Sequence, residues 1–189
     1  MAKVKLSEPF ESMSDGYNEK YFCSTRGTKT ILCKRCKNTN GQSEKQLVQQ
    51  GLFTDATKFA AAAKGDPVIW AWYESLKDPN HSAFNMAVAD FLTYPVVQQI
   101  DTTSYRGHAD EIIHLTAFYK FRVTSVTVSI TAPDGTLIEE GPALRREKSC
   151  YYSYLTTLEN PGLNGTVITA VATDTPGHRV ELSKTLKIE

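Results

Sequence analysis

The chain has 189 residues, of which 41% are hydrophobic and 22% are charged, and its formal net charge is zero. These values are typical of a globular protein with one or two domains, and they exclude a strong whole-molecule attraction to nucleic acid or anionic membranes. Four unevenly spaced cysteines exclude a disulfide scaffold, and no apolar run is long enough for a membrane helix. Because no secretory signal is evident, we expect a cytoplasmic protein with reduced thiols, although signal-independent export stays open.

The first part of the chain predicts a basic β-hairpin followed by helices. Two β-prone runs, YFCST and KTILC, flank Arg26 and Gly27 and predict a hairpin within residues 20–37. Ser43 and Gln46 match a capping box, which predicts a helix over residues 44–64. Asp66 before Pro67 predicts the start of a second helix, and Ser82 caps a third.

After Pro95 the pattern changes to short strands separated by turn signals. The strands are predicted near residues 97–103, 111–118, 122–131, 136–141, 150–157, 165–173 and 179–188. The clearest hairpin runs from 123 to 141, because alternating β-branched residues lead into a Pro-Asp-Gly turn. We therefore predict an α+β protein with a hairpin and helical domain, 1–96, and a seven-strand Ig-like β-sandwich, 97–189.

Several runs resemble an uncharacterised bacterial family that joins a small helical N-terminal region to an Ig-like C-terminal domain. The runs are ID at 100–101, SYRG at 104–107, VTSVTV at 123–128, PDGT at 133–136, EEG at 139–141 and ATDTPG at 172–177. The N-terminal part, with Phe22, Gly27, Gln46, Phe53 and the Asp66-Pro67 pair, is similar to proteins linked to mobile elements and phages. The resemblance implies the fold and no activity. This chain departs from the family by placing cysteines after the hairpin.

The cysteines near the hairpin form one C-x-x-C pair, Cys33 and Cys36, with Cys23 upstream. Zinc needs four ligands, and the residues after Cys36 do not read as the helix start that a thioredoxin-type motif requires. Incidental thiols are therefore favoured over a partial metal site or a redox pair. We predict no metal and no cofactor.

The hairpin region also carries clustered positive charge. Residues 1–45 contain nine Lys or Arg against five Asp or Glu, and the candidate binding residues among them are Lys29, Lys34, Arg35 and Lys37. With aromatic neighbours, such a segment could bind phosphates and stack bases. No nucleic-acid-binding motif accompanies it, so a solvated face or an acidic protein partner is favoured.

Two further groups in the second half bear on function. His108, Asp110, Glu111 and His114 contain metal-ligating side chains, but no catalytic motif surrounds them, and exposed polar residues are the favoured interpretation. Tyr152 and Tyr154 share one face of a strand, opposite Tyr151, and would form a binding surface if that face were exposed to solvent.

Together these features predict a non-enzymatic structural or protein-interaction module, of the kind that a larger bacterial or phage-derived assembly contains. Its partner would be another protein or a second copy of the chain, with no membrane contact. Nucleic-acid binding through the hairpin, 20–37, is the alternative.

Overall fold

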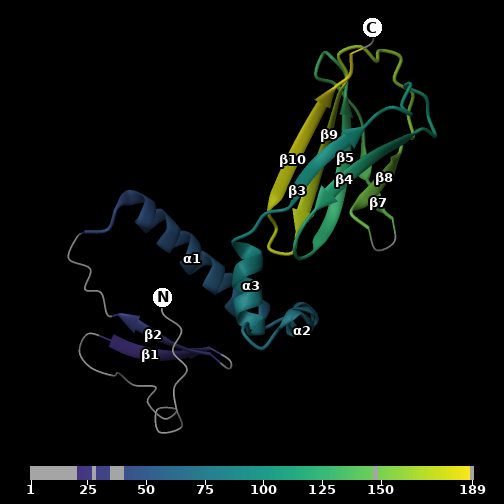
Figure 1. The fold of residues 1–189 in the computed structure, drawn as a ribbon. Helices are drawn as coiled ribbons and strands as arrows, with labels where there is room; N and C mark the ends of the chain where they lie inside the picture. The colour runs from purple at the N-terminus through teal and green to yellow at the C-terminus, as the bar shows by residue number, and fades with distance from the viewer. Residues whose placement is uncertain (1–20, 27–28, 35–40, 147–148, 188–189) are drawn as a thin grey trace. The chain divides into compact units, whose positions relative to one another are not determined.

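The computed structural model describes residues 21–26, 29–34, 41–146 and 149–187 (Figure 1). The chain divides into two compact units between Ala89 and Asp90, whereas the sequence placed the domain boundary between residues 96 and 97. No helix within the described residues is long and apolar enough to cross a membrane.

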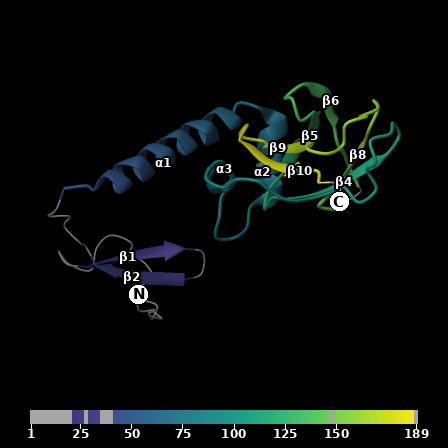
Figure 2. The same cartoon turned by 90° about the horizontal axis from the view of Figure 1, so that it is seen from above.

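The first described element of the first unit is the predicted hairpin. Strands β1 (Tyr21–Arg26) and β2 (Lys29–Lys34) pair antiparallel, with Tyr21 opposite Lys34 and Arg26 opposite Lys29. The two strands lie side by side in both views (Figure 1, Figure 2).

Three helices follow the hairpin: α1 (Glu44–Ala63), α2 (Pro67–Leu76) and α3 (Ala83–Phe91). The capping box is confirmed, since the Gln46 N–H donates to Ser43 Oγ and the Ser43 N–H donates to Gln46 Oε1. The Asp66 carboxylate accepts from two N–H groups in the first turn of α2. Each helix therefore starts at the polar residue that the sequence predicts.

The second unit contains two four-stranded antiparallel sheets, ordered β3-β4-β8-β7 and β10-β9-β5-β6. The strands are β3 (Val96–Asp101), β4 (Ile112–Phe118), β5 (Val123–Thr131), β6 (Leu137–Pro142), β7 (Leu144–Arg145), β8 (Tyr151–Leu155), β9 (Val167–Asp174) and β10 (Arg179–Thr185). Each of the seven expected strands overlaps one of these. The short β7 is an addition that the sequence did not predict.

The two sheets share one hydrophobic core, an arrangement that fits a β-sandwich. Inward-facing residues alternate with outward-facing ones along β4, β5 and β9. Both sheets contribute fully buried side chains: Ile113 and Leu115 from one, and Val126, Val128, Ile130 and Ile168 from the other. This alternation is the period of two by which the sequence predicted the strands.

The hairpin predicted over residues 123–141 forms between β5 and β6. Gly135 adopts a φ of 88°, and its N–H donates to Ala132 O, which closes the turn. The Thr136 N–H donates to the Asp134 carboxylate. The Pro-Asp-Gly signal therefore works as expected, because only glycine adopts this conformation without strain.

Candidate functional site

One side of the β3-β4-β8-β7 sheet points away from the core and is named here the outer sheet face. Ile112 lies opposite Leu155 on this face, Thr116 lies opposite Tyr151, and Leu144 lies opposite Ser153. Four of these residues are large, apolar and exposed: Leu144 at 71%, Tyr151 at 55%, Leu155 at 52% and Ile112 at 39%. Side chains directly opposite or diagonal across neighbouring strands lie within contact range, so these four form one apolar surface.

Beside the outer sheet face lies a polar hollow of about 220 Å³. Its lining includes Asp101 and Gln99 from β3, His114 from β4 and Arg146. The hydroxyl and N–H of Thr103 donate to Asp101 and lower the pKa of its carboxyl. The outer sheet face thus combines exposed apolar side chains with a charged polar border, as protein interfaces do.

The predicted tyrosine surface is wrong in its location. Tyr152 and Tyr154 do share a face of β8 opposite Tyr151, but that face points into the core and each is only 4% exposed. They therefore do not form a surface that a protein partner could cover. The exposed tyrosine of this strand is Tyr151, because its side of the sheet faces away from the core that the two sheets share.

The basic hairpin is described only in part. Lys29 begins β2, and Lys34, whose side chain is exposed, ends it. Arg35 and Lys37 lie outside the described residues, as does Cys36 of the C-x-x-C pair. Cys33 is a free thiol of intermediate burial. Binding through this hairpin and the state of its cysteines stay predictions.

The polar residues of segment 108–114 do not form one cluster in the structure. His114 lies on the outer sheet face, whereas His108 and Asp110 belong to the loop before β4. Glu111 Oε2 accepts from the N–H groups of Arg106 at 2.6 Å and His108 at 3.0 Å. Partial burial opposes ionisation of Glu111, but these backbone donors outweigh it and lower its pKa. Within the described residues no three His, Cys, Asp or Glu side chains group as metal ligands.

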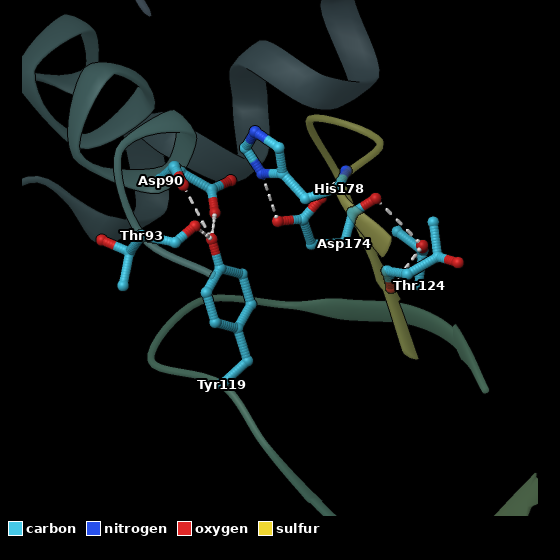
Figure 3. A network of polar contacts seen from close by, with 7 residues as sticks. Asp90, Thr93, Tyr119, Thr124, Asp174 and His178 are labelled. Atoms are coloured by element: carbon cyan, nitrogen blue, oxygen red, sulfur yellow. Dashed lines mark hydrogen bonds and ion pairs between the residues drawn. The ribbon is translucent and has the colours of Figure 1, made fainter. Parts of the chain in front are cut away.

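Two buried carboxylates form a polar network in the second unit (Figure 3). The Tyr119 hydroxyl lies 2.6 Å from Asp90 Oδ1, 2.7 Å from Asp90 O and 2.8 Å from Thr93 O. Burial, reinforced by the hydrogen bond to Asp90 and its charge, raises the pKa of Tyr119 far above its usual range. The hydroxyl therefore stays protonated and keeps its role as donor.

The second carboxylate, Asp174, holds the turn between β9 and β10. It accepts from the His178 N–H at 2.7 Å, and its Oδ2 lies 2.8 Å from His178 Nδ1. The rings of Phe91 and Tyr94 pack against the imidazole, with centroids at 5.1 and 4.4 Å. An Asp–His pair can orient a general base, but among the described residues no nucleophile hydrogen-bonds to His178. The aromatic packing indicates that this pair is structural.

A third buried carboxylate, Glu139, lies on β6. Its Oε2 accepts from the N–H and the hydroxyl of Thr157, both at 2.8 Å, and from the Leu158 N–H at 3.3 Å. Glu140, its neighbour, is exposed on the opposite face of the strand. Glu139 therefore ties β6 to the segment after β8, and the two adjacent glutamates cannot act as a carboxylate pair.

Sequence reasoning missed the outer sheet face and the polar network of Asp90 and Asp174. The sequence predicted a strand over residues 111–118, but nothing in it paired Ile112 with Leu155. Asp90 and Tyr119 are far apart in the chain and carry no motif. The ATDTPG turn was recognised, yet its Asp174 and His178 were not connected to each other.

No protein-family model and no curated protein matches the chain. Among solved structures it is similar to CopC from Methylosinus trichosporium OB3b, with a TM-score of 0.36 and 16% identity over 48% of this chain and 88% of that one. It is also similar to an engineered protein, with a TM-score of 0.35 and 18% identity over 56% of this chain and 29% of the other. It is similar, too, to a tetra-tandem repeat in the extending region of a large adhesion protein, with a TM-score of 0.32 and 20% identity over 48% of this chain and 22% of that one.

Proposed function

We propose that this chain is a non-enzymatic protein-interaction module that binds a partner protein, or a second copy of itself, through the outer sheet face. The observation that carries the proposal is the apolar surface formed by Ile112, Leu144, Tyr151 and Leu155, each exposed by more than a third. Contiguous exposed apolar side chains rimmed by polar groups are typical of protein-binding surfaces.

We further propose that the second unit is Ig-like. Naming its strands in chain order A, B, C, C′, D, E, F and G gives the sheets A-B-E-D and G-F-C-C′. This is the strand order of immunoglobulin domains. Such domains bind partners through loops, strand edges and sheet faces, so the fold is compatible with the proposed role but does not imply it.

The environment of the titratable groups supports a non-enzymatic role. Glu111 is occupied by backbone donors of its own loop, and His178 is packed between two aromatic rings. Catalytic acids and bases need access to a substrate proton at hydrogen-bond distance. The contacts of Glu111 and His178 therefore stabilise the local fold and leave neither side chain positioned as a catalytic acid or base.

Site-specific photo-crosslinking in the cells that make the protein tests this proposal. A photoreactive residue at Leu155 is expected to give discrete adducts with a partner or a second copy. The control is the same residue at Leu137, which is 54% exposed on β6 of the other sheet. Adding Leu144→Lys should abolish the adducts by placing a charge in the apolar surface.

Sedimentation velocity separates self-association from partner binding. If the partner is a second copy, wild-type protein should dimerise and Leu144→Lys should not, whereas Leu137→Lys should behave as wild type. A chain that stays monomeric and gives the same adducts from positions 155 and 137 would disprove the proposal.

A further inference from the structure

A second hollow lies at the end of the second unit where β4 leads into β5 and where β7 precedes β8. Its volume is about 410 Å³. That is near the lower end of the range for pockets that bind small molecules, about 300–1,000 Å³. It is lined by aromatic and apolar side chains that include Tyr94, Phe118 and Phe121, and by two basic side chains, Lys120 and Arg145. A pocket of this size accommodates one aromatic or aliphatic group rather than a large cofactor.

The described residues that line the hollow carry only positive charge. None of the described residues that line it is acidic, and neither Lys120 nor Arg145 forms an ion pair with a described residue. Arg145 Nε donates to Ser149 O at 2.8 Å, which holds the side chain and leaves the terminal guanidinium nitrogens for another acceptor. Lys120 Nζ lies 5.4 Å from the centroid of the Phe121 ring. The hollow therefore favours an anion.

A hydroxyl donor also borders the hollow. The Tyr152 side chain is mostly buried, but it lines the hollow and its hydroxyl forms no hydrogen bond with any described residue. The hydroxyl is therefore available to an acceptor that enters the hollow. Burial raises the pKa of Tyr152, against the opposing effect of the Arg145 charge, and the hydroxyl remains a donor.

We propose that this hollow binds an organic carboxylate carried on an aromatic or aliphatic body. Arg145 and Lys120 face the carboxylate, Tyr152 donates a hydrogen bond to it, and the aromatic side chains pack against the body. A carboxylate suits a single guanidinium, because its two oxygens match the planar fork of N–H donors. The same chemistry is presented by a free small acid and by the C-terminal residue of another protein. This binding does not depend on the outer sheet face.

Titrations of the ¹⁵N-labelled full chain, followed by NMR, test the proposal with defined probes. 4-Phenylbutyrate should bind saturably and shift the amides of residues 119–121 and 150–152. 4-Phenylbutan-1-ol, which keeps the body and lacks the charge, should bind at least about tenfold more weakly, the loss expected of one charge-assisted hydrogen bond. Arg145→Gln and Tyr152→Phe should each weaken binding of the acid.

The matched control is Arg106→Gln, which removes an exposed arginine from the loop between β3 and β4, and it should leave binding within about twofold of wild type. Lys120→Gln provides a second variant, and the dispersion of the spectra shows that each variant is folded. The proposal is overturned if the acid does not saturate below about 10 mM. It is equally overturned if the alcohol binds as well, or if Arg106→Gln weakens binding as much as Arg145→Gln.

Peptides ending in phenylalanine distinguish the two sources of the carboxylate. If a peptide with a free C-terminus binds more tightly than 4-phenylbutyrate and its amidated form does not bind, the ligand is a protein C-terminus. If the small acid binds and the peptide does not, the ligand is a free acid. Binding of the amidated peptide as tightly as the free one would overturn the assignment of a carboxylate.

Discussion

Removing the Tyr119 hydroxyl tests how the second unit satisfies its buried charge. Asp90 is completely buried, and the hydroxyl reaches its carboxylate, its carbonyl and the carbonyl of Thr93 within 2.8 Å (Figure 3). Tyr119→Phe preserves the ring and removes only this donor. A hydrogen bond to a buried charged group contributes about 1.5–3 kcal/mol, so the free energy of unfolding of this unit should fall by about 2 kcal/mol.

Urea denaturation of the full chain measures this change. Both tryptophans, Trp70 and Trp72, belong to the first unit, so tryptophan fluorescence follows that unit, and circular dichroism or tyrosine signals are needed for the second. The control is Tyr151→Phe, since Tyr151 is 55% exposed and its hydroxyl forms no hydrogen bond with a described residue. This control should stay within about 0.5 kcal/mol of wild type.

The comparison of the two variants decides the outcome. If Tyr119→Phe costs no more than Tyr151→Phe, the burial of Asp90 does not depend on this donor, and the reasoning is refuted. If the unfolding transition followed by tryptophan fluorescence shifts and the transition of the second unit does not, the hydroxyl stabilises a different part of the chain than its contacts indicate.

Three other predictions concern the loops of the second unit. Gly107→Ala should destabilise this unit by at least about 2 kcal/mol, because φ at Gly107 is 91° and the new Cβ would lie 2.5 Å from Asn160 O. Gly135→Ala should cost only about 1 kcal/mol, because φ at Gly135 is 88° but the space around it is open. Thermal denaturation of the two variants measures the difference. The pKa of Glu111 is lowered, so the ionised carboxylate stabilises the fold above pH 4.5, the ordinary pKa of glutamate, and this stabilisation is lost as the pH falls. Glu111→Gln should therefore reduce the fall in the free energy of unfolding at acid pH. An unchanged fall at acid pH would contradict this prediction. Thr156→Val should cost about 1–3 kcal/mol in urea, because the buried hydroxyl donates to His108 O at 2.9 Å and accepts from the Glu111 N–H at 3.0 Å; a loss below 0.5 kcal/mol would show that these groups find other partners.

Features that depend on neighbours in the chain could be predicted from the sequence. Ser43 with Gln46 and Asp66 with Pro67 start helices, because each cap satisfies N–H groups only two or three residues away. The β5–β6 hairpin follows from the Pro-Asp-Gly turn in the same way. The period of two along β4, β5 and β9 also indicated which residues of each strand share a face.

The candidate sites depended on contacts between distant segments. Alternation shows that Tyr152 and Tyr154 point to the side opposite Tyr151, but it does not show which side faces the core. Packing of this sheet against the β10-β9-β5-β6 sheet decides this, and it buries the two tyrosines that the sequence offered as a surface. Pairing of β8 with β4 brings Leu155 opposite Ile112.

Local residue types thus determined the caps, the turns and the two faces of each strand, since these need only short-range geometry. Tertiary structure alone decided which face is exposed and which buried groups meet. The hydrogen bond between Tyr119 and Asp90 forms only in the folded chain. Arg145 and Lys120 likewise line the same hollow only after distant strands have paired. Burial is a property of the assembled sheets, because it depends on which apolar faces cover one another.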